Sequence, residues 1–274
     1  MTQMTTDNLI EKQKPRSMAW TRTYDEAEPQ RVNRWLAQSG VCSRREAEAL
    51  IGQGLVSIDG LAIIDAGHKI EPGQTLTLAD AARSKLEGAL TVILHKPRGV
   101  VSAQPEPGQT PAIRLLTAGA LVGEAPAIPD RDSKLAPVGR LDLESRGLLI
   151  LSEDGVVAKA VIGPDAELEK EYRVAVIGAV TERKLAHLRH GLELDGRRLR
   201  PADVSLISDQ RLRIVLREGR NRQIRRMCEL VDLKVVDLFR VRVGALWLGT
   251  LPESRWRVLT ADERRALIER RAPA

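Results

Sequence analysis

Apolar residues in the first third of the chain recur at two spacings, one typical of helices and one typical of strands. The segment 31–40 has its apolar positions on one helical face and ends in glycine, and 43–54 repeats this pattern behind a Ser–Glu capping box. The segment 56–64 alternates around Asp59–Gly60, a dipeptide typical of a tight hairpin turn, and a further turn and strand follow. These elements predict one compact unit over residues 30–79.

The rest of the chain carries longer apolar runs between helical patterns. Strands are expected at 91–97, 147–155, 171–178, 204–209, 211–219, 234–244 and 256–260, and helices at 156–163, 181–191, 221–232 and 261–271. Several neighbouring strands have the pattern of antiparallel hairpins, and the order is not a regular β-α-β repeat. The sequence therefore predicts an α+β fold with a mixed, largely antiparallel sheet rather than a Rossmann sheet.

The same pattern places the domain boundaries. We expect a disordered tail at 1–29, the small unit at 30–79, a linker at 80–89, a larger domain at 90–260 and a C-terminal helix and tail at 261–274. Within the larger domain, 102–137 is rich in Pro, Gly and Ala. It is long for a connection, which indicates a functional loop or an insertion.

Charge changes the picture, because the 274 residues carry a formal net charge of +6 and the positive residues are clustered. Between Arg211 and Arg226 there are seven arginines and one acid, Glu218. Strand and helix periodicity places most of them opposite the apolar positions. This pattern favours phosphate binding, since guanidinium groups match phosphate geometry; the alternative is a solvated basic face with scattered ion pairs. Aromatic residues make up only 3%, so a stacking platform for single strands is not expected.

Other residue types exclude several classes of protein. Two cysteines and four histidines without ligand spacing argue against a structural metal and fit a reducing compartment. The N-terminus lacks the apolar core of a secretory signal. No apolar run approaches the roughly 20 residues that a membrane span needs, so we expect no membrane segment.

The most informative string is PVGRLDLESRGLLILSEDG, residues 137–155. Arg140 and Asp142 are two positions apart in an extended or turn segment, so their side chains can share one side. A carboxylate held among arginines stays ionised, which suits a nucleophile or a base rather than a general acid. A structural ion pair in a loop explains these residues equally well.

This string resembles the catalytic motif of the pseudouridine synthases that modify bacterial ribosomal RNA: G-R-L-D, then Thr or Ser, G-L-L and a closing D-G. Lys170–Val174 (KEYRV) is similar to the second motif of that group, and 218–229 (EGRNRQIRRMCE) to its third. Residues 30–79 resemble an S4 RNA-binding domain. By these motifs the chain is identified as a member of the RsuA/RluB/RluE/RluF family, most similar to its RluF branch, over about residues 30–265.

The resemblance implies a fold and a reaction. The fold is a small S4-like domain followed by a pseudouridine synthase domain. Asp142 is the essential carboxylate of a reaction that breaks the N1–C1′ bond of uridine and joins C5 to C1′. Nothing is oxidised or hydrolysed, so neither a cofactor nor a metal is expected. The carboxylate either attacks C1′ or helps to remove a ribose proton to give a glycal, and the sequence leaves both open.

The same resemblance assigns roles to further residues. Tyr172 packs against the uracil, which loses its stacking partners when it is flipped out of the RNA. Arg225 pairs with the catalytic carboxylate, Ile224 lines the pocket, and Arg140 helps to splay the RNA. The RNA-binding residues are expected to be Arg140, Arg220, Arg222 and Arg226 in the larger domain and Arg31, Arg44, Arg45 and Lys69 in the S4-like unit.

The implied partner is ribosomal RNA, 23S RNA in the first place, either free or in pre-ribosomal particles, and the implied enzyme is a cytoplasmic monomer. Two alternatives remain at this point. One is a non-catalytic RNA-binding assembly factor on a degenerate synthase fold. The other is a nucleoside hydrolase, which usually needs two carboxylates with opposed roles, and Glu144 is the only acid adjacent to Asp142.

Overall fold

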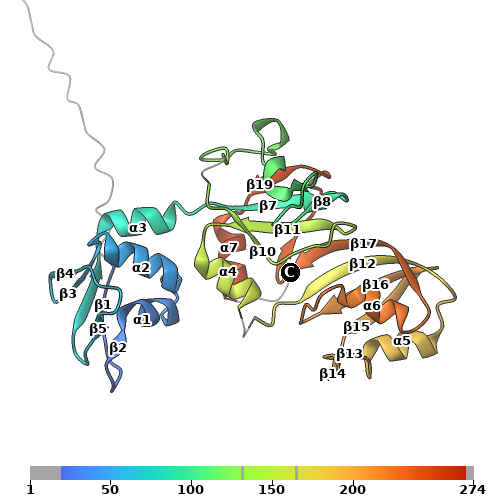
Figure 1. The fold of residues 1–274 in the computed structure, drawn as a ribbon, viewed down its shortest axis with the longest axis horizontal. Coiled ribbons are helices and arrows are strands. Elements are labelled where there is room, and N and C mark those ends of the chain that lie inside the picture. Colours follow the sequence, from blue (N-terminus) through green and yellow to red (C-terminus); the bar gives the residue numbers. More distant parts are fainter. Residues whose placement is uncertain (1–19, 131–132, 164–165, 270–274) are drawn as a thin grey trace, which may run out of the picture. The chain divides into compact units, whose positions relative to one another are not determined.

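The computed structural model describes residues 20–130, 133–163 and 166–269 (Figure 1). Its contacts divide the chain into two units, the first reaching to Gly88 apart from residues 40–43, and the second beginning at Ala89. This boundary lies close to the one expected from the sequence.

In its described residues, the first unit combines a four-stranded antiparallel sheet with three helices. Its elements are β1 Trp20–Thr23, β2 Gln30–Arg31, α1 Val32–Gln38, α2 Arg44–Gly52, β3 Val56–Ile58, β4 Leu61–Ile63, β5 Lys69–Ile70, β6 Thr75–Leu78 and α3 Asp80–Glu87. The sheet order is β1-β6-β3-β4, and β2 pairs separately with β5. Asp59 and Gly60 both have positive φ angles between β3 and β4, as the predicted hairpin turn requires.

The expected tail at 1–29 ends earlier than predicted. Residues 1–19 lie outside the described residues, but Trp20–Thr23 pairs with β6 and belongs to the sheet. Tyr24 is buried, and its ring packs edge-on against Trp35 at a centroid distance of 5.3 Å. The short segment carries no hydrophobic period long enough to detect. The feature of the sequence that could have indicated this strand is that two of the few aromatic residues, Trp20 and Tyr24, lie within five positions of each other.

The expected linker at 80–89 is also different in the structure, because residues 80–87 form the helix α3 of the first unit. Ala82 is fully buried, and the backbone N–H of Ala79, just before the helix, donates to Leu55 O. A helix of eight residues with one buried alanine has too little apolar surface to show a periodic stripe. Composition therefore suggested a linker where packing forms a helix.

The second unit is built on a nine-stranded mixed sheet with the order β15-β16-β12-β17-β11-β7-β19, to which β10 and β18 add at the side (Figure 1). Its strands are β7 Thr91–Lys96, β8 Val100–Val101, β9 Thr110–Pro111, β10 Ala136–Val138, β11 Arg146–Ser152, β12 Lys170–Ile177, β13 Glu193–Leu194, β14 Arg197–Arg198, β15 Asp203–Ser208, β16 Arg211–Leu216, β17 Lys234–Val243, β18 Leu246–Trp247 and β19 Trp256–Val258. All pairs in this sheet are antiparallel except β11 with β17. The predicted α+β class with a largely antiparallel sheet is confirmed.

The sequences of β7 and β11 are continuous apolar runs because both faces of each strand are buried in the core. Leu149 and Leu151 of β11 face one core cluster, and Leu148 and Ile150 face another. The first cluster includes residues of α5 (Glu182–Arg189) and α6 (Gln223–Glu229), and the second includes residues of α4 (Gly155–Ile162) and α7 (Ala261–Ile268). Helices therefore pack on both sides of the sheet.

Two helices of the second unit begin with a side-chain cap. The Thr181 hydroxyl accepts from Lys184 N at the start of α5, and Thr260 and Glu263 form a reciprocal capping box at the start of α7. Each satisfies backbone donors that a helix N-terminus leaves open.

The long segment 102–137 is not a structureless loop. It contains β9, the 3-10 turns η1 (Ala112–Leu115) and η2 (Ala118–Ala120), and the start of β10. Ala112 and Leu116 are buried in the core, and Val122 N donates to Trp256 O. The segment therefore covers one end of the sheet, and its low apolar periodicity reflects short turns rather than a lack of packing.

Candidate active site

A pocket of about 460 Å³ opens where the loop before β11 meets β12, β17 and the segment before α6. Its walls bring together three of the motifs found in the sequence. Asp142 and Arg140 come from the loop, Tyr172 from β12 and Ile224 from α6. The candidate catalytic residues are thus drawn from positions more than 80 residues apart in the chain.

The loop that carries Asp142 is held from both sides by hydrogen bonds. The Ser102 hydroxyl donates to Leu141 O at 2.7 Å and accepts from Leu141 N at 2.8 Å. Gly99 N donates to Leu143 O, and Ser145 N donates to Asp142 O across a turn. These bonds fix the backbone on each side of Asp142, so its carboxylate is presented to the pocket in a defined position.

A glycine makes the junction behind this loop possible. Strands β11 and β17 pair in parallel only at Arg146–Phe239 and Gly147–Arg240. Gly147 has a φ of +113°, and a Cβ added there would lie 2.2 Å from Arg240 O. No other residue type fits this approach without moving one strand.

Arg225 holds the carboxylate loop from the side of α6. Its side chain is only 8% exposed, and its Nε lies 4.0 Å from Asp142 Oδ2. Its Nη2 donates to Glu144 O and to the Ser145 hydroxyl, both at 3.3 Å, and its Nη1 forms an ion pair with Glu144 at 3.6 Å. The Nε–H has no hydrogen-bond partner. Arg225 therefore binds the loop backbone and still has a buried donor directed at the Asp142 side.

Lys96, the last residue of β7, binds the backbone of the Asp142 loop. It is fully buried, and its Nζ donates to Ser145 O at 2.7 Å and to Pro97 O at 2.8 Å. Burial lowers the pKa of this lysine to about 8, although the nearby charge of Asp142 acts in the opposite direction. Sequence reasoning missed Lys96. A lysine inside an otherwise apolar strand was the signal that could have found it.

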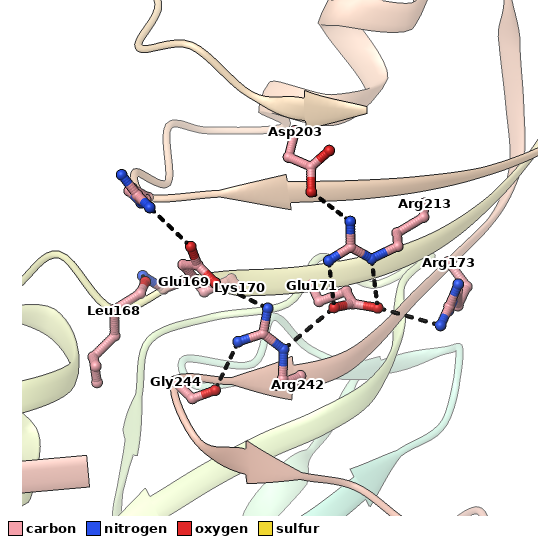
Figure 2. A network of polar contacts seen from close by, with 10 residues as sticks. Leu168, Glu169, Lys170, Glu171, Arg173, Asp203, Arg213, Arg242 and Gly244 are labelled. Carbon is pink, nitrogen blue, oxygen red and sulfur yellow. Dashed lines mark hydrogen bonds and ion pairs between the residues drawn. The ribbon is translucent and has the colours of Figure 1, made fainter. Parts of the chain in front are cut away.

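Strand β12 places alternate residues on opposite sides of the sheet. Lys170 and Tyr172 line the pocket. Glu171, between them, points to the other side, where it meets Arg213 of β16 and Arg242 of β17 (Figure 2). Tyr172 is 9% exposed, so one part of its ring packs in the core and another borders the pocket.

A bulge in β17 explains how two nearby arginines reach opposite sides. Glu171 lies opposite Arg242 and Tyr172 lies opposite Arg240, so one residue of β17 is skipped. Arg240 faces the pocket, and its guanidinium donates to Leu148 O and to Arg140 O. It thereby ties β17 to the strand and the loop on either side of Asp142. Strict alternation along the sequence hides this position.

The arginines of the segment 211–226 are paired more extensively than their sequence suggested. Six of the seven form ion pairs, with acids that come mainly from distant parts of the chain: Arg213 with Asp203 and Glu171, Arg217 with Glu169, Arg220 with Glu218, Arg222 and Arg225 with Glu144, and Arg226 with Asp195. Arg220 also donates to three backbone carbonyls, those of Leu194, Arg197 and Arg198. The sequence argument counted only the local acid, and the fold supplies the others.

The basic residues expected to bind RNA in the first unit are exposed and, in the described structure, are not bound to acids. Arg31, Arg44, Arg45 and Lys69 are all exposed. Within the part of the chain that the structure describes, none of the four forms an ion pair. Arg31 and Lys69 also line a shallow pocket together with Arg34 and Tyr24. Their charges are open to a polyanion.

The described residues hold no group of three or more potential metal ligands. The acids of the pocket are Asp142 and Glu218. Glu218 accepts from Gln223 Nε2 and Arg200 N and pairs with Arg220. Glu144, the second acid considered for a hydrolase, does not line the pocket. Among the described helices, none has the length and apolar character to cross a lipid bilayer.

Comparison with known proteins identifies the families of both units. Residues 90–230 match the family model of RNA pseudouridylate synthases, and residues 30–76 match that of the S4 domain. The dual-specificity RNA pseudouridine synthase RluF of Escherichia coli is 32% identical over 85% of this chain and 76% of its own. The ribosomal large subunit pseudouridine synthase B of Bacillus subtilis is 32% identical over 85% of this chain and 93% of its own.

The solved structures include a pseudouridylate synthase that covers 86% of this chain and 99% of its own, with a TM-score of 0.58 and 24% identity, which supports the fold. The order of the domains and the motif resemblance found in the sequence are thus confirmed. The non-catalytic alternative finds no support in these relatives. The chain belongs to the RNA pseudouridylate synthase family and is an isomerase that acts on RNA.

Proposed function

We propose that this enzyme converts uridine to pseudouridine in large-subunit ribosomal RNA, with 23S RNA as its target, in the cytoplasm and as a monomer. The named targets of its relatives support the choice of RNA, since one is described as acting on the ribosomal large subunit. The exposed cations of the S4 unit supply affinity for the phosphate backbone, and the pocket of the second unit carries out the reaction.

The observation that carries this proposal is that Asp142 and Tyr172 line one pocket and that Arg225 lies 4.0 Å from Asp142. The Asp142 carboxylate acts at C1′ of the target ribose. Arg225 is the positioning residue that orients this carboxylate, because its buried Nε lies 4.0 Å from Oδ2. Tyr172 offers an aromatic edge against which the flipped uracil packs. Ile224 closes the apolar side of the pocket.

The expected RNA contacts follow from exposure and pairing. Arg140 is exposed beside the pocket and splays the RNA at the target. Arg222 is bound only loosely to Glu144, at 3.4 Å, and is available to phosphate. Arg220 and Arg226 would contribute less to phosphate binding, because their donors already contact carbonyls and Asp195.

The experiment is tritium release from ribosomal RNA labelled at uracil C5, because C5 loses its hydrogen only when it becomes the new glycosidic carbon. Large-subunit and small-subunit RNAs are tested separately, each as free RNA and as precursor particles, and the product nucleosides are separated by chromatography. We expect release from large-subunit RNA with pseudouridine as the product. Release from small-subunit RNA alone would contradict the proposed target, and free uracil would indicate the hydrolase instead.

A further inference from the structure

Lys170 lines the pocket but has no role in the reaction as described so far. It lines the pocket two positions before Tyr172, on the same side of β12, and its Nζ donates to Leu168 O at 3.2 Å. Both neighbours along the strand are acids, so an ion pair with one of them is the first expectation. The structure shows a different arrangement.

Both neighbouring acids form ion pairs with arginines instead (Figure 2). Glu171, with a side chain only 3% exposed, forms ion pairs with Arg242 and Arg213 at 3.2–3.3 Å. Glu169 forms ion pairs with Arg242 and Arg217, both at 3.0 Å. Among the described residues, no carboxylate lies within 4.0 Å of Lys170 Nζ. A largely enclosed lysine without a carboxylate partner is typical of a functional amine.

The remaining polar groups of the pocket leave few candidates for accepting a proton. The arginines that line it cannot lose their own protons at physiological pH; these are Arg140, Arg217, Arg220, Arg222 and Arg240. Glu218 is held by Gln223, Arg200 and Arg220. Asp142 is needed at C1′. Of the described groups, Lys170 and the Tyr172 hydroxyl remain.

The reaction requires such an acceptor. Once the N1–C1′ bond has broken with its electron pair on N1 and the C5=C6 pair has formed the C5–C1′ bond, C5 still carries its hydrogen. Removing that proton returns the C5–H electron pair to the ring as C5=C6, and N1 takes up a proton. The net change is an isomerisation with no oxidant or reductant.

We propose that the amine of Lys170 accepts the C5 proton in this last step, as a catalytic residue beside Tyr172. The assignment rests on the proposed function, because it assumes that the pocket holds the target uracil. The Glu169–Glu171–Arg213–Arg242 network acts through β12 as a positioning device. It binds both acids to arginines, so that neither Glu169 nor Glu171 stabilises the ammonium form of Lys170.

The charge environment agrees with this role. Burial, assisted by the nearby charge of Arg240, lowers the pKa of Lys170 to about 8. At pH 7 roughly a tenth of the amine is then neutral, compared with less than about a thousandth for an ordinary lysine. The other ionisable groups that face the pocket are Asp142, Arg140, Tyr172, Arg217, Glu218, Arg220 and Arg222.

The test compares Lys170→Met and Lys170→Arg in single-turnover reactions with RNA carrying either hydrogen or deuterium at C5 of uracil. Arginine keeps the positive charge but cannot accept a proton. We therefore expect both variants to be slower by about 10²-fold or more, with a C5 isotope effect larger than that of the wild type. Lys134→Met, at an exposed lysine, is the matched control and should keep the wild-type rate and isotope effect.

If C5–H cleavage already limits the wild type, the isotope effect cannot rise, and the readout becomes rescue of Lys170→Ala by methylamine. We expect the amine to restore turnover of this variant and not of Asp142→Asn. Full activity of Lys170→Arg would mean that only a cation is needed, and an unchanged isotope effect in Lys170→Met without amine rescue would mean a structural role; either overturns the assignment. A rise of the isotope effect in Tyr172→Phe alone would give the role to the tyrosine.

The outcomes also separate this inference from the proposed function. Turnover by the wild type together with an unaffected Lys170→Met variant overturns the lysine assignment alone. Absence of tritium release by the wild type from every RNA tested overturns the proposed function and this assignment with it.

Discussion

Two basic regions of this molecule differ in what their charges contact. In the second unit, six of the seven arginines between Arg211 and Arg226 form ion pairs, and for all but Arg220 the fold brings an acid from outside the segment. In the S4 unit, the described Arg31, Arg44, Arg45 and Lys69 are exposed and form no ion pairs. The first region uses its charge to build a pocket, and the second leaves its charge open to RNA phosphate.

This difference teaches that a density of arginine along a sequence is not the same as free charge on a surface. A guanidinium bound to two acids has lost much of its ability to attract a polyanion, but it gains the geometry that a catalytic site needs. The comparison predicts that substitutions in the pocket region alter stability and turnover, whereas substitutions in the S4 unit alter RNA affinity and its dependence on salt.

The largest expected effect is on stability. Arg242→Met removes the arginine shared by Glu171 and Glu169 and leaves the buried Glu171 carboxylate short of one cation, so we expect the free energy of unfolding to fall by about 3–5 kcal/mol. Urea unfolding measures it. Arg200→Met, which breaks an exposed pair with Glu167, is the control and should change stability by no more than about 0.5 kcal/mol. Equal losses of stability in the two variants would mean that the buried arginine network contributes no more to folding than an exposed ion pair does.

The next effect is on turnover. Arg225→Met leaves the Asp142 loop without its side support, and we expect kcat to fall by about 10²-fold while RNA affinity stays within about twofold. Arg211→Met is the matched control, because Arg211 is the one arginine of the segment for which the described structure shows no ion pair. A large loss of RNA affinity with kcat preserved would mean that Arg225 serves phosphate rather than the carboxylate.

A buried cation gives a third, pH-dependent test. The pKa of Lys96 is lowered to about 8 in the folded protein, so between pH 8 and its unfolded value the unfolded chain binds more protons. Stability from this group therefore rises as pH increases through that window. We expect Lys96→Met to lose about 2 kcal/mol of that rise, measured by urea unfolding at pH 7.5 and pH 10. Parallel stability curves for the two proteins would contradict the assignment.

The smallest effect is on binding. Replacing Arg44 and Arg45 together by Gln should weaken RNA binding by about tenfold and reduce the slope of log affinity against log salt by about 2, with kcat at saturating RNA unchanged. Arg226→Gln, whose arginine is bound to Asp195, should change the salt slope by less than half as much. A larger slope change in Arg226→Gln would reverse the comparison of the two regions.

Much of the fold follows from the sequence because its signals are local. The apolar runs at 91–96 and 146–152, the hairpin at Asp59–Gly60 and the capping box at Thr260 each depend on neighbouring residues. The sequence did not predict the β1 strand and the α3 helix, because each is short and becomes stable only through contacts with the rest of the first unit.

The site was predictable in part for the same reason. Motif resemblance named Asp142, Tyr172 and Arg225. In the structure Asp142 and Tyr172 line one pocket, and Arg225 lies behind it with its Nε 4.0 Å from Asp142 Oδ2. The sequence did not predict Lys96 and Arg240 as site residues, because both act by donating to backbone carbonyls that are distant in sequence. For Arg240, a bulge in β17 also breaks the alternation of side chains. Apart from Glu218, the acids that bind the 211–226 arginines could not be identified from the sequence either, because they come from distant parts of the chain.

The most direct test of the account is single-turnover tritium release from C5-labelled ribosomal RNA by Asp142→Asn and the wild type, with RNA affinity measured on the same preparations. The account predicts that the variant loses turnover by at least about 10⁴-fold and binds RNA as tightly as the wild type. Tritium release by Asp142→Asn at a rate near that of the wild type would contradict it, because the carboxylate on which the whole pocket converges would then be dispensable.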